Sequence, residues 1–151
     1  MNGNTKPNYL ISVLTNKCPR CRKGYIFETK NAYNFKDITK MPQNCAVCGQ
    51  PTEIEVGFYY GTGYVSYALS IAFSVAFFIA WKVLIGITLA IDDNRIFYFM
   101  GAYIIVILTI QPLLMRLSRS IWLSWFVSYD AEWQLHNPQK TERTIEAYKA
   151  N

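Results

Sequence analysis

The stretch "YVSYALSIAFSVAFFIAWKVLIGITLAI" occupies residues 64–91 and carries one charged side chain, Lys82. As an α-helix rising about 1.5 Å per residue, this stretch would be roughly 40 Å long, which exceeds the hydrocarbon core of a bilayer, about 30 Å thick. Either the helix is tilted in the membrane, or it leaves the hydrocarbon near Lys82 and its remainder lies at the outer interface. In both cases the stretch predicts a transmembrane helix.

A second apolar run follows a short polar turn. The turn is "DDNR", residues 92–95, and its Asp and Asn side chains favour turns and helix N-caps. The next run covers residues 96–115 and is broken only by Gln111 and Pro112, which we expect to mark a kink. The sequence therefore predicts a membrane α-helical hairpin over residues 57–115, with two transmembrane helices at about 62–90 and 96–115.

Charge distribution predicts the orientation of this hairpin. The chain has a net charge of +5, and residues 1–50 contain eight Lys or Arg against two acidic residues. Residues 116–151 contain five Lys or Arg against four acidic residues, whereas the turn between the spans is acidic on balance. Because positive flanks stay on the cytoplasmic side, both termini are expected in the cytoplasm. Basic ends around an apolar middle also favour a membrane protein over a nucleic-acid binder.

Two cysteine pairs precede the first span. They are "CPRC", with Cys18 and Cys21, and "CAVC", with Cys45 and Cys48. A C-x-x-C turn presents two thiolates on one side of a tight knuckle, and two knuckles can enclose one tetrahedral metal ion. Short aromatic and β-branched runs between the pairs favour a small β-ribbon. Residues 17–56 are therefore predicted to form a zinc-ribbon-like β module.

The metal in this module is expected to be structural zinc. A reducing cytoplasm keeps thiols free to bind metal. Iron in a rubredoxin-like site and thiol redox chemistry remain alternatives, because four sulfur ligands suit either metal. Four thiolates around Zn²⁺ leave a formal charge of −2, and a group of nearby cations should offset it: Lys17, Arg20, Arg22 and Lys23. A site closed by four ligands has no open position for catalysis, and a ribbon this near the bilayer is not expected to bind nucleic acid.

The junction between the module and the first span combines small and aromatic residues. It reads "GFYYGTGYVSY" over residues 57–67. One interpretation is an aromatic belt at the membrane interface. The other is a surface on which another helix packs closely, as glycines spaced four apart permit. The residues of this candidate partner-binding surface are Gly57, Tyr60, Gly61, Gly63, Tyr64 and Tyr67.

Residues 116–135 place aromatic side chains at helical spacing after two arginines. They fit a C-terminal amphipathic helix lying in the interface, or a cytoplasmic extension of the second span. Lys82 fits a side chain reaching to the outer interface, or the partner of an acid in another chain. The remaining segments are a short amphipathic stretch at 1–16 and a polar tail at 136–151. The candidate lipid-interface residues are Lys82, Arg116, Arg119, Trp122, Trp125 and Trp133.

The order of these features resembles a bacterial family known as domain of unknown function 983. The similarity covers about residues 14–130, and its most specific part runs from Glu55 to Tyr67. The first knuckle departs from the C-x-x-C-G pattern, since Arg22 follows Cys21 and the glycine is at position 24. The resemblance implies a small inner-membrane protein with a zinc-ribbon-like head and no established activity. Its association with cytochrome oxidase assembly genes suggests an accessory role.

Together these patterns favour a non-enzymatic accessory, assembly or scaffold subunit of a larger membrane complex, or a self-associating protein. It would sit in the bacterial inner membrane with a structural zinc head on the cytoplasmic side. The alternative is a metal or redox protein that serves a respiratory enzyme by electron transfer or metal delivery.

Overall fold

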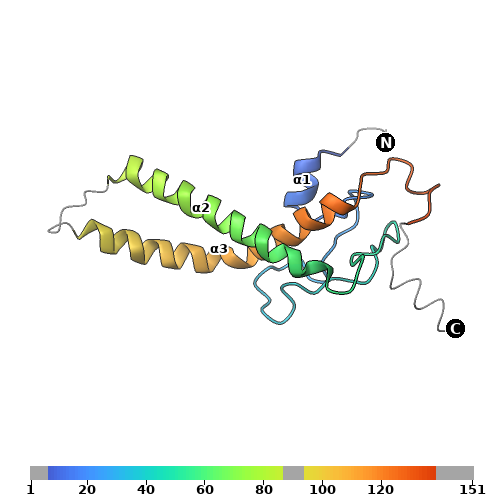
Figure 1. Ribbon diagram of the computed structural model, residues 1–151, viewed down its shortest axis with the longest axis horizontal. Helices are drawn as coiled ribbons and strands as arrows, with labels where there is room; N and C mark the ends of the chain where they lie inside the picture. The colour runs from blue at the N-terminus through green and yellow to red at the C-terminus, as the bar shows by residue number, and fades with distance from the viewer. Residues whose placement is uncertain (1–6, 87–93, 139–151) are drawn as a thin grey trace.

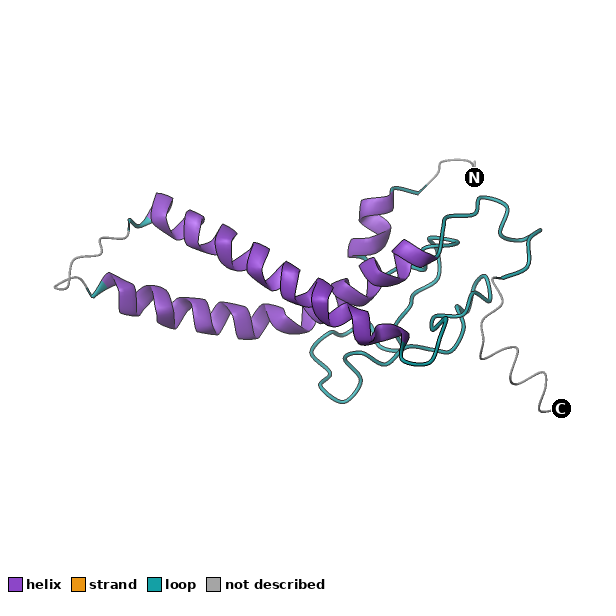
Figure 2. Cartoon of the chain, viewed as in Figure 1, coloured by secondary structure: helices purple, strands orange, loops and turns teal. Residues whose placement is uncertain are grey.

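The computed structural model describes residues 7–86 and 94–138. Its helices, in chain order, are α1 (Tyr9–Leu14), the short 3-10 helix η1 (Phe58–Gly61), α2 (Thr62–Leu84) and α3 (Arg95–Phe126). Figure 1 shows α2 and α3 as an antiparallel pair, and the loops, drawn in teal in Figure 2, gather around one end of it. The molecule is thus a helical hairpin with a head built on the C-terminal end of α3.

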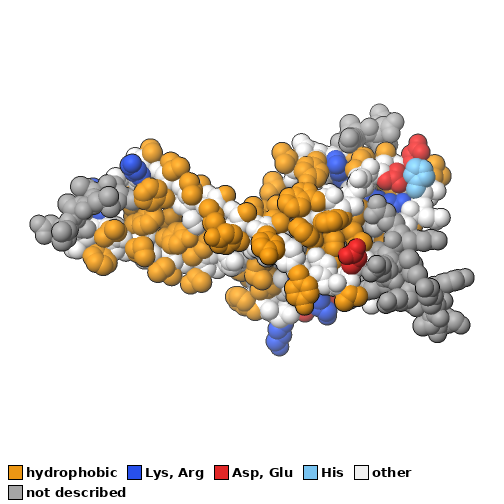
Figure 3. All heavy atoms as spheres, in the orientation of Figure 1, with side chains coloured by type: hydrophobic (Ala, Val, Ile, Leu, Met, Phe, Trp, Pro, Cys, Tyr) orange, Lys and Arg blue, Asp and Glu red, His pale blue; other side chains and the backbone are white. Residues whose placement is uncertain are grey.

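Both long helices have the length and composition of membrane spans. At about 1.5 Å per residue, the 23 residues of α2 extend roughly 35 Å and the 32 residues of α3 roughly 48 Å. In the most apolar window of each helix, 0% and 6% of the residues are buried. A core helix of a soluble protein would be mostly buried, whereas here hydrophobic side chains cover the outside of the pair (Figure 3). The predicted pair of helices able to cross a membrane is confirmed.

Helix α2 ends earlier than the sequence predicted. It stops at Leu84, and Gly86 follows with a left-handed φ of 78°. The predicted boundary near residue 90 is therefore wrong, because this glycine turns the chain out of the helix. Residues 87–93 lie outside the described part of the chain.

An aromatic cluster joins α2 to α3 in the half of the hairpin far from the head. Phe77 lies at its centre, with ring centroids 5.8 Å from Phe99, 5.8 Å from Tyr103 and 5.9 Å from Trp81. The Ser74 hydroxyl and the Tyr103 hydroxyl are 2.7 Å apart and hydrogen bond across the pair. Offset aromatic packing and one buried polar contact therefore fix the register of the two helices.

Helix α3 does not stop at the expected end of the second span. It continues to Phe126, so residues 116–126 extend the span, and residues 127–138 contain no helix. The predicted C-terminal amphipathic helix over 116–135 is wrong, and its alternative, an extension of the second helix, is confirmed. Pro112 lies inside α3, which changes direction along its length in Figure 1. A proline inside a helix removes one backbone hydrogen bond and accounts for such a bend.

The head contains no strand in its described residues, so the predicted β module is wrong. Each cysteine knuckle closes with a single antiparallel bridge, Lys17 with Tyr25 and Asn44 with Pro51. The loop between the knuckles makes only scattered contacts with itself, such as the Glu28 N–H donating to the Lys40 carbonyl at 3.1 Å, and several of its other carbonyl groups accept from a side chain of α3. The head core combines the cysteines with residues from this loop, η1, α3 and the segment after α3: Ile26, Phe27, Phe58, Leu123 and Val127.

The start of α2 packs on the end of α3 through one glycine. A Cβ atom at Gly61 would lie 2.2 Å from the Trp122 ring, whereas a Cβ at Gly63 would meet nothing within 4 Å. The Trp122 indole N–H also donates to the Phe58 carbonyl at 2.8 Å. Gly61 is therefore required for this close crossing, and Gly63 is not.

We expect Gly61→Ala to lower the free energy of unfolding by about 2 kcal/mol, because the Trp122 ring must move and lose its hydrogen bond. Gly63→Ala is the matched control, and its higher helix propensity should leave stability unchanged or raised by up to about 1 kcal/mol. Thermal unfolding of both variants in detergent measures the difference. Equal midpoints for the two variants would contradict this account of the crossing.

Candidate metal centre

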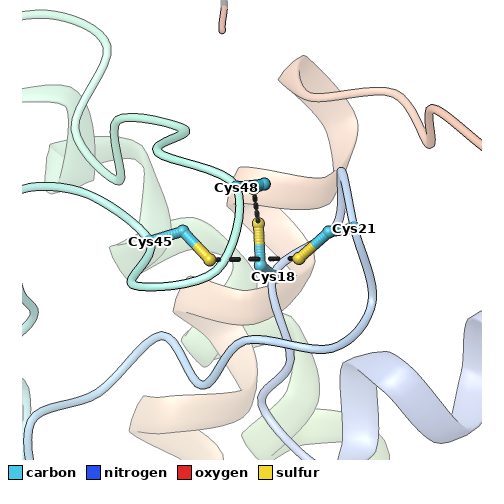
Figure 4. Close-up of side chains that lie close together, drawn as sticks. All are labelled: Cys18, Cys21, Cys45 and Cys48. Carbon is cyan, nitrogen blue, oxygen red and sulfur yellow. Dashed lines mark hydrogen bonds between the residues drawn. The ribbon is translucent and has the colours of Figure 1, made fainter. Parts of the chain in front are cut away.

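The four cysteines meet in one buried cluster. Cys18 and Cys48 have Sγ atoms 3.7 Å apart, and Cys21 and Cys45 have Sγ atoms 3.9 Å apart, as Figure 4 shows. All four sulfur atoms lie within 4.8 Å of one another. A tetrahedral ion with metal–sulfur bonds of about 2.3 Å needs sulfur atoms about 3.8 Å apart. Disulfide sulfurs are only about 2.05 Å apart, so the cluster has the geometry of a metal site with free thiols.

Both knuckles need a left-handed residue directly after their second cysteine. Gly49 has a φ of 68° in the second knuckle, and Arg22 has a φ of 54° in the first. In each knuckle this residue donates its backbone N–H to the carbonyl of the first cysteine, Gly49 to Cys45 at 2.9 Å and Arg22 to Cys18 at 2.7 Å. The two C-x-x-C pairs therefore have the same local geometry, although only one carries the glycine that this conformation favours.

Aromatic contacts accompany the strained Arg22. Its guanidinium lies 4.3 Å from the ring centroid of Tyr129 and 5.6 Å from that of Tyr9. Cation–π contacts of this kind contribute roughly 0.5–1 kcal/mol at exposed sites, similar to the cost of placing a non-glycine residue in the left-handed region. The departure from the C-x-x-C-G pattern is thus offset by contacts with α1 and with the segment after α3.

Gly24 brings the first knuckle against the second. A Cβ atom at this position would lie 2.3 Å from the Cys45 sulfur. The Gly24 carbonyl accepts from the Cys18 N–H at 2.8 Å, and its own N–H points at the Cys21 sulfur at 3.5 Å. Only glycine leaves room for the sulfur of the opposite knuckle at this distance.

The electrostatics of the cluster suit a bound cation. Hydrogen bonds to Cys21 and Cys45, together with burial, raise the pKa of Cys18, and burial raises the pKa of Cys48 to about 12. Hydrogen bonds from Cys18 and Cys45 lower the pKa of Cys21. Four sulfurs this close cannot all ionise unless a positive charge lies among them. A divalent metal would supply that charge and replace the protons.

Compared with family models, curated proteins and solved structures, the chain matches none of them.

The cations expected to offset the thiolate charge are placed around the cluster, mostly on aromatic faces. Lys17 lies 5.7 Å from the Tyr25 ring centroid, and Lys23 lies 5.9 Å from that of Trp133. The Arg20 side chain contacts the second knuckle directly, because its Nη1 donates to the Cys48 carbonyl at 3.4 Å.

Arg20 also ties the metal cluster to the segment after α3. Its side chain is 4% exposed, and its Nη2 donates to the carbonyls of His136 at 2.7 Å and Asn137 at 3.1 Å. The same nitrogen lies 3.4 Å from the Asp130 carboxylate. Desolvation raises the pKa of Asp130, but hydrogen bonds from the His136 ring and the Glu132 N–H outweigh it and lower that pKa. The first knuckle and the C-terminal segment are thus held together by a charge-assisted network.

Arg116 is the largest fully buried side chain in the described part of the chain, at 1% exposure. Its guanidinium lies 4.8 Å from the Phe27 ring centroid and directs all three nitrogens at the loop between the knuckles. Nε donates to the Ile38 carbonyl at 2.8 Å, and Nη1 to the carbonyls of Thr29 at 2.8 Å and Lys30 at 3.3 Å. Nη2 donates to the Thr29 hydroxyl and the Asn31 carbonyl, both at 2.9 Å. Its predicted place at the lipid interface is wrong, because α3 carries it into the head.

The other candidate lipid-interface residues divide between the head and the surface. Arg119 is half-buried, with Nη1 donating to the Thr39 carbonyl at 2.8 Å, and Trp122 and Trp133 pack against the head core. The lipid-interface assignment is therefore wrong for Trp122 and Trp133, because both side chains are partly buried and pack against the head core. Trp125 is 63% exposed and Lys82 is exposed near the end of α2, so both remain compatible with contact to lipid.

The candidate partner-binding residues also divide. Gly61 is used inside the molecule against Trp122, and Gly57 adopts a left-handed φ of 79° where η1 begins. The remaining residues are exposed. Tyr60 is 88% exposed, Tyr64 82% and Tyr67 70%. Gly63 has open space around it, since a Cβ atom there would meet nothing within 4 Å.

Sequence reasoning missed the residues that join the head to α3. The partners of Arg116 are 78 to 87 positions away in the chain, and those of Arg20 in the C-terminal segment are 110 to 117 positions away. No local pattern signals contacts over such separations. The sequence did contain a signal for the close approach at Gly24. A glycine a few residues after a C-x-x-C pair marks the point where the backbone turns back past the cysteine sulfurs.

Proposed function

We propose that this protein is a non-enzymatic accessory, assembly or scaffold subunit of a larger membrane complex. In this proposal the hairpin crosses the bacterial inner membrane with both termini in the cytoplasm, and the metal-bound head is a rigid cytoplasmic contact module. The basic flanks of the two spans and the resemblance to domain of unknown function 983 support this placement.

The observation that carries the proposal is that the cysteine cluster is part of the core joining the head to α3. All four cysteines are buried at 1% to 8% exposure, together with Leu123 and Val127 from the end of α3 and just beyond it. A metal held by four buried thiolates fixes protein shape and has no open coordination position for a substrate. Such a centre would hold the head in one orientation relative to the spans.

The exposed tyrosine surface supports contact with another protein. Tyr60 lies in η1, and Tyr64 and Tyr67 follow it at the start of α2, next to the head. Tyrosine offers a large, rigid surface and a polar group, which suits helix packing near a membrane interface. In the proposal this surface, together with Gly63, is where the partner complex packs.

Purification in a mild detergent tests the proposal. We expect the protein to co-purify with the same integral membrane subunits at a fixed stoichiometry. Tyr64→Ala should reduce that co-purification about tenfold, the effect of losing one well-packed aromatic contact at an interface. Tyr98→Ala is the matched control, because Tyr98 is 71% exposed but lies near the far end of α3. A monomer without any partner or self-association, or equal loss in both variants, would overturn the proposal.

Metal analysis of the same preparation separates the structural role from electron transfer or metal delivery. One tightly held, colourless zinc per chain is expected for the structural centre. The cluster geometry suits zinc and iron equally. Iron–thiolate absorption in the visible range, or a metal that exchanges readily with a chelator, would favour the redox or delivery function instead.

A further inference from the structure

A cavity with both polar and apolar lining lies on the head side of the hairpin, and none of the cysteines lines it. Its volume is about 200 Å³. At roughly 30 Å³ per water molecule, this space equals six or seven waters and can accommodate a phosphate group. It is lined by residues of the head loop, α2 and α3: Thr39, Thr62, Gly63, Ser66, Gln111, Met115, Ser118 and Arg119.

The position of the cavity along α3 matches the headgroup layer of a membrane. Counted from Arg95 at about 1.5 Å per residue, Gln111 lies roughly 24 Å and Arg119 roughly 36 Å along the helix. The hydrocarbon core is about 30 Å thick, so its inner edge falls between these two residues. This step rests on the membrane placement in the proposed function. At that depth the glycerol esters and phosphates of the lipids meet the protein.

Arg119 supplies positive charge to the cavity. Within residues 7–86 and 94–138, only its Nη1 has a hydrogen-bond acceptor, the Thr39 carbonyl at 2.8 Å and more weakly the Met41 sulfur at 4.0 Å. Its guanidinium lies 4.7 Å from the Tyr59 ring centroid, which holds it in place. Glu53 interacts electrostatically with Arg119 but does not line the cavity. In contrast to Arg116, this arginine keeps Nε and Nη2 available for an anion.

The other polar groups of the cavity can accept or donate to a ligand. The hydroxyls of Thr62 and Ser118 donate to carbonyls of their own helices, at 2.6 Å and 2.9 Å, and keep lone pairs free. Gln111 makes no hydrogen bond to any described residue through its side chain, although it lies in the apolar part of α3. An amide at this depth is costly without a polar partner, so a ligand with hydrogen-bonding groups would stabilise it.

We propose that this cavity binds the headgroup of an anionic phospholipid. The phosphate would contact the guanidinium of Arg119, and the glycerol oxygens would lie toward Gln111 and Ser66. A lipid suits the site better than a soluble phosphate ester, because one edge of the cavity is the exposed Gly63 at the start of α2, so the cavity opens onto the outside of the hairpin. Acyl chains could therefore continue along the apolar surface of the hairpin.

Native mass spectrometry of the detergent-solubilised protein with defined lipids tests this proposal. We expect the protein to retain phosphatidylglycerol at least about tenfold more than phosphatidylcholine, because phosphatidylcholine would bring its choline cation next to the Arg119 guanidinium, whereas phosphatidylglycerol carries no positive charge. Gly63→Leu fills the cavity and should reduce phosphatidylglycerol retention about tenfold. Gly101→Leu is the matched control, because a Cβ at Gly101 also meets nothing within 4 Å and that position lies far from the cavity. Equal retention in the two variants would overturn the proposal.

Substitution of the arginine gives a second, independent measurement. Arg119→Gln should remove the preference for phosphatidylglycerol, and Arg119→Lys should keep part of it, because lysine retains the charge but not the fork of donors. Inorganic phosphate in excess should not displace the lipid, and displacement would show that a free phosphate is the ligand and overturn the lipid proposal. Metal content and partner co-purification of the unmodified protein are measured alongside. If the partner co-purifies and the metal content is normal while the unmodified protein shows no lipid preference, the lipid site fails and the accessory function stands.

Discussion

Cys21→Ser is expected to abolish stoichiometric metal binding and unfold the head while the two long helices remain. The four cysteines belong to a buried core cluster that also contains Leu123 of α3 and Val127 just after it, so they help to join the head to α3. Removing one ligand from a structural site should cost more than about 5 kcal/mol, comparable to the whole stability of a small domain. Metal content per chain, together with hydrogen exchange over residues 17–56, measures the effect.

Ala46→Ser is the matched control for the cysteine variant. It introduces the same hydroxyl next to Cys45, but Ala46 is exposed and is not one of the four cysteines of the cluster. We expect its metal content and exchange rates to equal those of the unmodified protein. Full metal content and unchanged exchange in the Cys21→Ser protein would show that the cluster does not hold the head together.

Arg116→Met is expected to release the loop between the knuckles from α3. The substitution removes the donors for four backbone carbonyls and a hydroxyl that are partly buried against the helix, among them those of Thr29, Asn31 and Ile38. Buried acceptors left without donors cost about 1–3 kcal/mol each, and breaking a buried charged network typically costs about 3–5 kcal/mol. Thermal unfolding and hydrogen exchange over residues 27–41 measure the loss.

Two further variants separate the donor geometry of Arg116 from its charge. Arg116→Lys keeps the charge but presents three donors from one point, so about half of the loss is expected. Lys82→Met removes an exposed cation near the other end of the hairpin and should change stability by less than about 0.5 kcal/mol. If Arg116→Met were no more destabilising than Lys82→Met, the buried network would contribute nothing to the attachment of the loop.

The features that could be predicted from the sequence are those encoded in short stretches. An apolar run of sufficient length predicts a helix that can cross a membrane, and two C-x-x-C pairs predict a four-sulfur cluster whatever lies between them. Both predictions are confirmed at the level of the helices and the cysteine geometry. The identity of the metal, the partner and the family resemblance stay predictions.

The errors arose where one residue type has two uses. An arginine just after an apolar run is typical of an interface anchor, and Trp122 at helical spacing is typical of an aromatic belt. In the structure both face the head, because α3 continues beyond the span and presents them to it. The β module was expected because the aromatic residues between the knuckles favour strands. Of these residues, Tyr25 and Phe27 pack in or against the head core, whereas Tyr33 and Phe35 are exposed.

The head is assembled from both ends of the chain, and this fixes an order of events during synthesis. The cysteines leave the ribosome first, yet Arg116, Leu123 and Val127, which complete their surroundings, follow only after both long helices. At about 5–20 residues per second, the interval between Cys48 and Leu123 lasts roughly 4–15 s. The cysteine cluster can therefore be completed only after both long helices have been synthesised. If the hairpin enters the membrane as proposed, assembly of this cluster follows insertion of the helices.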